Sequence, residues 1–553
     1  MGSNYSRRRG GMSTNNDNDG GPPASAAAAA AAGSQDEEGS DLVTLLSYLI
    51  RSGQVRIIPG SLRDGEDDDD DDDDDDDEDE FEGTRKPPKV ICAPDTSELD
   101  MSELRQQILL NSGRFQYLHN KCKPHMQHKL LHRELGVVGR KKEHFHQGDR
   151  SLASSNFLPN LMERKAKYSH KAFCGMYSQN GEVFLSACQD RNIRLYDSTN
   201  GQFKLFNTIR ARDVGWSILD VAFSPDGNYL IYSSWSECIH LCNIYGDQEI
   251  HQALNLRPAD SRFCIFSLTF SMDNREIMGG ANDGCLYVYD RDCQTRTLKI
   301  ECHDDDVNAV AFADETSNIL FSGGDDGLLK VWDRRTLSED HPTPVGTLAG
   351  HSDGITYIDS KGDARYLLSN CKDQSIKLWD IRKFASSDAV QATKRAVSKQ
   401  TWDYRWQQFP KRTIKKRMLP GDSSVMTYMG HSVLHTLIRS RFSPEFTTGS
   451  RFIYTGCATG SVVVYDTLTG KIVTKLDEHR AVVRDASWHP YENNIMSTSW
   501  DGSIGLWTYV PQINELERDL VTDSDSDNST TPRRIKRLKE QQIPRLQNPL
   551  PLH

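Results

Sequence analysis

The sequence predicts an all-β fold, a seven-bladed β-propeller, from the spacing and the endings of a repeated unit. Most units end in Trp-Asp or a related pair, and the spacing between successive ends is 46, 47, 43, 47, 86 and 42 residues. A period in the forties with a terminal Trp-Asp is typical of WD40 blades, each a four-stranded antiparallel sheet. The ends are Tyr196-Asp197, Cys242-Asn243, Tyr289-Asp290, Trp332-Asp333, Trp379-Asp380, Tyr465-Asp466 and Leu506-Trp507.

The single spacing of 86 residues equals one blade plus an insertion, which we assign to residues 383–429. Seven units are then present in residues 156–512, and seven blades close a ring whose strand edges are short and protected. The insertion is basic and aromatic, and three uses remain open. The first is stacking on single-stranded nucleic acid, the second is binding of an acidic segment of a partner, and the third is packing of the insertion's tryptophans on the propeller.

A polar set inside three units supports the propeller. Each set holds a histidine, a serine, an aspartate and a tryptophan, whose groups satisfy one another when buried. Because the set recurs once in each of three units, we interpret it as a structural network and not as a hydrolase triad, which an enzyme needs only once. The sets are His303, Ser322, Asp326 and Trp332; His351, Ser369, Asp373 and Trp379; and His479, Ser497, Asp501 and Trp507.

The first 40 residues are rich in Gly, Ser, Asn and Ala, which predicts a disordered tail. Gly2 fits the myristoylation pattern M-G-x-x-x-[ST], with a plain flexible tail as the alternative. Contact with a membrane is expected only if Gly2 is lipidated.

Residues 41–58 predict a short helix with an apolar stripe at i, i+3, i+4 and i+7, formed by Leu42, Leu45, Leu46 and Leu49. The helix either folds back on the domain or enters a groove on a partner.

Residues 59–96 predict an acidic disordered linker, because Glu66–Glu80 is an unbroken run of 15 acidic residues. Outside that run 64 acidic residues face 66 basic ones, so binding of nucleic acid by the whole surface is not expected.

Residues 97–155 predict a helix around Ser97–Leu110 followed by a basic segment. In that segment the spacing of Cys122, His125, His128 and His132 resembles that of metal ligands. Neighbouring lysines oppose a bound cation, so we expect neither a metal nor a cofactor.

Residues 513–553 predict a second disordered tail. Its basic residues Arg533, Arg534, Lys536 and Arg537 are either a nuclear-localisation signal or a solvated charge run, and we expect a nuclear and cytoplasmic protein.

Two neighbouring units share the pattern W-D-x-R, in Trp332-Asp333-Arg334-Arg335 and Trp379-Asp380-Ile381-Arg382. Since Trp-Asp ends the third strand of a blade, Arg335 and Arg382 are expected side by side on one rim of the ring. Planar guanidinium groups there suit bidentate contacts with a partner protein. The simpler alternative is that each arginine only pairs with its own aspartate. A third match, Trp402–Arg405, has no strand before it and is treated as a chance match.

With the strands that precede them, Leu320–Asp326 and Leu367–Asp373, the two W-D-x-R motifs resemble the sixteen-residue box of the cullin 4-associated factors. The resemblance extends to Lys171–Gly175, Gly279–Cys285 and Trp402–Gln408. It implies a non-catalytic substrate receptor whose Trp332, Asp333, Arg335, Trp379, Asp380 and Arg382 dock on the ligase adaptor, a protein of the damage-specific DNA-binding protein one type. Cullin 4 and the RING subunit are then indirect partners, and bound target proteins are ubiquitinated and degraded.

The alternative function is a WD40 scaffold outside ubiquitination that binds chromatin proteins or RNA through the insertion. No nucleophile–base pair or phosphate loop stands out beyond the repeated polar sets, so we do not expect an enzyme. The sequence does not identify the substrates.

Overall fold

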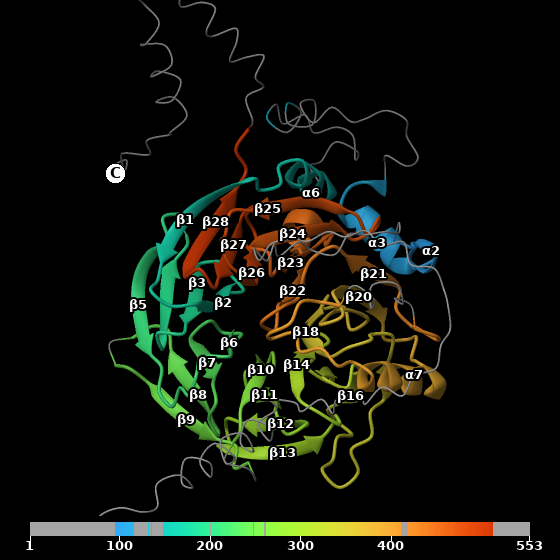
Figure 1. Ribbon diagram of the computed structural model, residues 1–553. Helices are drawn as coiled ribbons and strands as arrows, with labels where there is room; N and C mark the ends of the chain where they lie inside the picture. The colour runs from blue at the N-terminus through green and yellow to red at the C-terminus, as the bar shows by residue number, and fades with distance from the viewer. Residues whose placement is uncertain are drawn as a thin grey trace, which may run out of the picture. The chain divides into compact units, whose positions relative to one another are not determined.

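The computed structural model describes residues 94–115, 131, 134 and 147–511, except 200, 247, 259–261 and 411–418. In these residues strands β1 to β28 form seven four-stranded sheets, arranged as the blades of a ring (Figure 1). The predicted seven-bladed propeller is confirmed. No helix in the described part of the chain has the length and apolar character needed to cross a membrane. Gly2, the Leu42–Leu49 stripe, the acidic run, the Cys122–His132 group and the C-terminal tail lie outside the described residues.

The first three blades follow one another along the chain, each built from four consecutive strands that pair antiparallel. Blade 1 contains β2 (Ala172–Tyr177), β3 (Val183–Cys188), β4 (Asn192–Asp197) and β5 (Lys204–Arg210). Blade 2 contains β6 (Asp220–Phe223), β7 (Tyr229–Ser233), β8 (Cys238–Asn243) and β9 (His251–Asn255). Blade 3 contains β10 (Ile265–Phe270), β11 (Glu276–Ala281), β12 (Cys285–Asp290) and β13 (Thr295–Glu301).

The next three blades repeat this order. Blade 4 contains β14 (Val307–Phe312), β15 (Ile319–Gly324), β16 (Leu329–Asp333) and β17 (Gly346–Leu348). Blade 5 contains β18 (Ile355–Ser360), β19 (Tyr366–Cys371), β20 (Ser375–Asp380) and β21 (Met426–Met429). Blade 6 contains β22 (Ser440–Phe442), β23 (Phe452–Gly456), β24 (Ser461–Asp466) and β25 (Ile472–Asp477).

Blade 7 joins the two ends of the propeller. Its strands are β26 (Val483–Trp488), β27 (Ile495–Ser499) and β28 (Ser503–Thr508), and its outer strand is β1 (Leu161–Lys167) from the N-terminal side. β1 pairs antiparallel with β28, which the ribbon shows at the point where the first and last colours of the ring meet (Figure 1). This pairing closes the ring by backbone hydrogen bonds.

The second and third strands of each blade are buried because both of their faces pack against neighbouring blades. β19 and β20 are buried along their whole length, whereas the outer strand β5 is mostly exposed. Between blades 4 and 5 the core is formed by apolar side chains of both sheets, including Phe321, Ile355 and Trp379. Burial of such side chains is the main stabilising contribution to a fold of this kind.

The insertion in blade 5 is shorter than predicted. Residues 426–429, assigned to it from the sequence, form β21, which pairs with β20 as the fourth strand of blade 5. The inserted segment contains the helix α7 (Ser387–Ser398). Ser386 caps its N-terminus, because the Ser386 hydroxyl accepts a hydrogen bond from the amide of Ala389. The spacing rule missed β21 because a four-residue strand carries little periodic signal.

Charged side chains that lie beside the central axis link distant blades. Figure 1 shows the first strand of each blade nearest this axis. Arg439, just before β22 of blade 6, contacts Asp220 of blade 2 (2.5 Å) and Asp485 of blade 7 (3.2 Å). Arg441 contacts the same Asp485 at 2.6 Å, and all four side chains are buried or nearly so. We call Arg439, Arg441, Asp220 and Asp485 the axial cluster.

Blade 6 carries a buried histidine that gives a pH-dependent prediction. His431 is fully buried, with Nδ1 3.0 Å from the Tyr465 hydroxyl and Nε2 3.0 Å from Asn370 Oδ1. Burial lowers the pKa of His431 to about 4, against 6.5 for an exposed histidine. The unfolded chain therefore binds the proton more readily, so the stability that the neutral ring contributes is present above pH 6.5 and is lost as the pH falls toward 4.

We expect the stability advantage of the wild-type chain over His431→Gln to shrink by about 2 kcal/mol between pH 7.5 and pH 5. Urea unfolding of both chains at the two pH values measures this difference. Other titrating groups, such as the buried Asp359 carboxyl with its pKa raised to about 6 by burial, are common to both chains and cancel. An advantage that is the same at both pH values would contradict the prediction.

Candidate docking surface

The two rims of the ring follow from the alternation of the strands. Loops after the first and third strands of every blade lie on one rim, which we call the lower rim, and loops after the second and fourth strands lie on the upper rim. Asp333 ends β16 and Asp380 ends β20, the third strands of blades 4 and 5. The W-D-x-R arginines therefore lie on the lower rim of neighbouring blades.

The predicted polar sets form hydrogen-bonded networks, which we call braces, that link the upper-rim loops of a blade to its second and third strands. In blade 4, His303 Nδ1 lies 3.0 Å from Asp326, its Nε2 lies 2.8 Å from Ser322 Oγ, and Trp332 Nε1 donates to the same oxygen (2.9 Å). Burial alone raises the pKa of the Asp326 carboxyl, but the hydrogen bond from His303 reverses this and the pKa is lowered overall. Blade 7 repeats the brace with His479, Ser497, Asp501 and Trp507.

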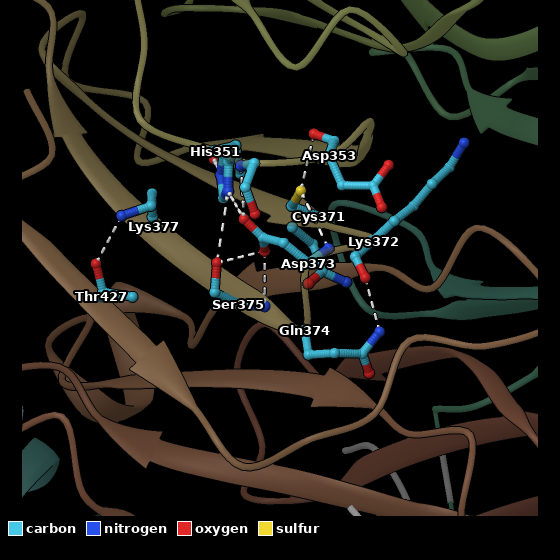
Figure 2. A network of polar contacts seen from close by, with 12 residues as sticks. His351, Asp353, Cys371, Lys372, Asp373, Gln374, Ser375, Lys377 and Thr427 are labelled. Carbon is cyan, nitrogen blue, oxygen red and sulfur yellow. Dashed lines mark hydrogen bonds and ion pairs between the residues drawn. The ribbon is translucent and has the colours of Figure 1, made fainter. Parts of the chain in front are cut away.

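Figure 2 shows His351 and Asp373, two residues of the brace of blade 5. His351 lies between Asp373 (3.0 Å) and Ser369 (2.7 Å), and Trp379 Nε1 donates to Ser369 Oγ at 2.7 Å. Asp373 also accepts a hydrogen bond from the Ser375 hydroxyl (2.6 Å). Because Trp379 is fully buried in this network, the residues that follow it leave the sheet at a fixed position.

In the described part of the chain, one group of three metal-type ligands lies close together, namely His351, Cys371 and Asp373. Both ring nitrogens of His351 are taken by hydrogen bonds. The Cys371 thiol donates to the carbonyl of Asp353 (3.1 Å), and burial raises its pKa well above the ordinary value, so the thiolate that a metal needs is disfavoured. His351 and Asp373 therefore act as part of the brace, and Cys371 is a buried thiol beside it.

Both W-D-x-R arginines are exposed and held by their own aspartates. Arg335 donates through Nε and Nη2 to Asp333 (2.9 and 2.7 Å), and its side chain is 66% exposed. Arg382 makes the same pair of contacts with Asp380 at 3.2 Å and is 57% exposed. Hydrogen bonds from the side chain and backbone of Arg335 lower the pKa of Asp333 to about 2. Each arginine therefore pairs with the aspartate of its own turn, and more than half of its side chain stays exposed to a partner.

Two N-terminal helices lie beside this surface, a position that the sequence did not predict. α2 (Ser97–Asp100) and α3 (Glu103–Asn111) bury Leu99, Leu104 and Ile108 against blades 5 and 6. Glu103 pairs with Arg365, which also contacts Asp380 (3.2 Å), the partner of Arg382. Further along, α6 (Gln147–Ser155) contacts α8 (Glu445–Thr448) on the same rim.

These helices add apolar area to the lower rim. Met101 is 86% exposed and Leu110 is 62% exposed, although both belong to a segment whose other apolar side chains are buried. Lys383, next to Arg382, pairs with Glu98 of α2 at 2.6 Å. A surface of exposed guanidinium groups next to exposed apolar side chains has the composition of a protein-binding site.

The Trp402–Arg405 match lies elsewhere, in the inserted segment. Trp402 Nε1 donates to Asp353 in the loop after β17 (3.0 Å), and the amide of His435, in the loop after β21, donates to the carbonyl of Tyr404 (2.7 Å). Both loops belong to the upper rim. The segment therefore packs Trp402 on the propeller, whereas Trp406 remains 75% exposed. The basic residues 411–418 lie outside the described residues.

The fold and the braces define a WD40 propeller protein, and a family model supports this assignment. The model of the family described as WD domain, G-beta repeat matches residues 204–243, 293–333, 342–380 and 470–508. These matches cover parts of all seven blades.

More specific relatives share most of the propeller. The chain is 42% identical over 386 residues to a DDB1- and CUL4-associated factor 11 homolog of Caenorhabditis elegans, and 43% identical over 368 residues to that of Caenorhabditis briggsae. These alignments cover 68% and 64% of this chain and 66% of each relative, just under two thirds of their length. A LEC14B homolog of Prunus armeniaca is 39% identical over 402 residues, which is 69% of this chain and 83% of the relative. The chain belongs to the family of WD-repeat proteins that these three relatives represent.

Proposed function

We propose that the protein is a substrate receptor of a cullin 4 RING ubiquitin ligase and that Arg335 and Arg382 contact the DDB1-type adaptor. The observation that carries the proposal is the pair of exposed guanidinium groups on one rim of neighbouring blades, each oriented by an aspartate. The names of the two nematode relatives describe association with DDB1 and CUL4. In this assignment the chain supplies binding, and the ligase's RING subunit directs ubiquitin transfer.

The pre-oriented arginines explain how such a surface gains affinity. A long side chain loses rotamer freedom when a partner immobilises it, at a cost of about 0.5–1.5 kcal/mol. Asp333 and Asp380 restrict their arginines before binding, which reduces that cost. Met101 and Leu110 of the adjacent helices then contribute apolar contact area at the same rim.

The test is co-purification of the adaptor with full-length chains expressed in cells. We expect Arg335→Glu combined with Arg382→Glu to weaken adaptor binding about a hundredfold or more, because two interface arginines are replaced by repelling charges. The lysine pair, Arg335→Lys with Arg382→Lys, keeps the charge but loses the bidentate geometry, and we expect an intermediate loss.

The matched control carries the same change of charge on the upper rim, in Arg191→Glu with Arg480→Glu. Both residues are exposed, in the loops after β3 and β25. This control should bind the adaptor as the wild-type chain does. Equal binding by the lower-rim and wild-type chains would overturn the proposal. Salt-dependent binding of RNA without recovery of any adaptor would instead favour the scaffold function.

A further inference from the structure

The exposed tryptophans of the chain gather on the upper rim. All nine tryptophans lie in the described residues, and three of them are exposed. Trp216 (51% exposed) lies in the loop after β5 and Trp235 (43% exposed) lies in the loop after β7, both on this rim. Trp406 belongs to the inserted segment, which contacts the same rim. Large apolar side chains that gather in water on one face are typical of a binding surface.

Two of these tryptophans belong to a row of five aromatic rings that crosses the upper ends of blades 7, 1, 2 and 3. The Phe173 ring, on β2, has its centroid 5.2 Å from that of Trp216 and 5.5 Å from that of Trp500, in the loop after β27. The Trp235 ring lies 6.4 Å from Phe266 on β10. The glycine that precedes Trp216 joins the two halves of the row, since a Cβ there would lie 2.8 Å from the Cβ of Trp235. We call Trp500, Phe173, Trp216, Trp235 and Phe266 the aromatic arc.

An acidic group lies at the blade 3 end of the arc. Asp305 and Asp306 are in the loop after β13, on the upper rim, and Asp306 directly precedes β14. β14 lies beside β10, because the Val310 amide donates to Ser267 Oγ at 3.3 Å, and Ser267 directly follows the last ring of the arc. Burial, and after it the charge of Asp306, raises the pKa of the Cys264 thiol, three residues before Ser267. The acidic group is therefore adjacent to the aromatic arc.

Negative charge exceeds positive charge in this group. Asp325 and Asp353, in the loops after β15 and β17, lie on the same side of the mouth as the two consecutive aspartates. The basic neighbours are Lys372 and Arg405. Lys372 Nζ is taken by both carboxylate oxygens of Asp325, at 2.7 and 2.8 Å. Four carboxyl groups therefore face two cations, and one of the two cations is already paired.

Asp306 is the member of the group whose carboxyl lacks a partner. It is half-buried, and no hydrogen bond or ion pair reaches its carboxyl group from the part of the chain that the structure describes. Partial burial, and then the charges of Asp325 and Asp305, raise the pKa of Asp306 to about 7. A neighbouring cation would lower this pKa and restore the charge. Lys171, at the other end of the arc, already lies over the Trp500 ring (4.0 Å). A cation from a partner is therefore what the acidic end of the arc lacks.

We propose that the aromatic arc binds a peptide segment of a partner protein in which a lysine or arginine stands next to apolar side chains. The apolar side chains cover Trp216 and Trp235, and the cation forms charge-assisted hydrogen bonds with Asp305 and Asp306. A tryptophan face beside the same cation adds cation–π attraction. The binding surface goes beyond the proposed ligase function, because the adaptor arginines lie on the lower rim. Only the assignment of the segment to a ligase substrate rests on that function.

The charge of the acidic group disfavours single-stranded nucleic acid, the other ligand that stacks on exposed tryptophans. Nucleic acid carries a phosphate for every base, and the carboxylates at the end of the arc repel it. A basic peptide is attracted by the same carboxylates.

The test is selection of a phage-displayed library of random peptides on the full-length chain, followed by fluorescence anisotropy with the selected peptides. We expect peptides in which lysine or arginine adjoins leucine, isoleucine or an aromatic residue. Asp305→Asn with Asp306→Asn should bind these peptides about tenfold or more weakly, because it removes charge and keeps the shape of the side chains. Trp216→Ala with Trp235→Ala, which shortens two exposed side chains, should weaken binding by about tenfold or more as well.

The matched control is Asp477→Asn with Glu478→Gln, two consecutive exposed acids on the upper rim after β25 of blade 6. This control should bind the selected peptides as the wild-type chain does. Recovery of the adaptor should be the same for all of these chains, so a failure of this inference is distinguishable from a failure of the proposed function.

Three results of the selection would overturn the proposal: acidic peptides, equal peptide affinity of the wild-type and Asp305/Asp306 chains, or no selected peptide at all. Binding of single-stranded poly-uridine that is lost in the Trp216/Trp235 chain would also overturn it, because the arc would then be a nucleic-acid surface.

Discussion

Replacing Arg439 with methionine is expected to lower the free energy of unfolding by about 3–5 kcal/mol. Arg439 is 4% exposed and bridges Asp220 and Asp485, which are equally buried. Without the guanidinium, the Asp220 carboxylate loses its ion-pair partner away from water, and Asp485 retains Arg441. Breaking a buried pair from one side costs more than the pair itself contributes, because a charge remains uncompensated.

Urea unfolding of wild-type and Arg439→Met chains measures this loss. The double variant Arg439→Met with Asp220→Asn removes the uncompensated carboxylate, so we expect it to regain part of the lost stability. A single variant that unfolds at the wild-type urea concentration would show that the axial cluster contributes little. The result matters for the ring as a whole, since this cluster joins blade 6 to blades 2 and 7.

The second large effect is expected at Trp379, where the brace meets the docking surface. Trp379→Ala should lower the free energy of unfolding by about 3–5 kcal/mol, because it removes a fully buried side chain and leaves a cavity. Trp379→Phe keeps most of the volume and loses mainly the N–H donated to Ser369, so a loss of about 1–2 kcal/mol is expected.

The two Trp379 variants also separate stability from docking. Arg382 and Asp380 lie on the rim and pair with each other, so the folded Trp379→Phe chain should bind the adaptor almost as the wild-type chain does. Adaptor binding is measured on folded protein at a temperature below the Tm of each variant. A complete loss of binding by Trp379→Phe would mean that the indole itself takes part in docking.

The periodic part of this structure could be predicted from the sequence because its signals are local. Trp-Asp endings recur at nearly constant spacing, and the braces place four residue types at fixed offsets within one unit. The exposure of Arg335 and Arg382 on one rim follows from strand alternation alone.

The features that were missed depend on contacts between residues far apart in the chain. Arg439 and Asp220 are separated by 219 residues, and no sequence pattern marks two ordinary charged residues as partners. Glu103 and Arg365 are 262 residues apart, so one helix around Ser97–Leu110 could be predicted, but neither its division into α2 and α3 nor its position beside Arg365.

The pairing of β1 with β28 has a consequence for synthesis of the protein. Asn160 and Val510, which hydrogen-bond beside this pair, are 350 residues apart, and chains are made at about 5–20 residues per second. The strand β1 therefore leaves the ribosome roughly 20–70 s before its partner exists. During that interval β1 has no partner strand, so its backbone groups are open to pairing with other chains. A chain terminated before β26 leaves β1 without the rest of its blade.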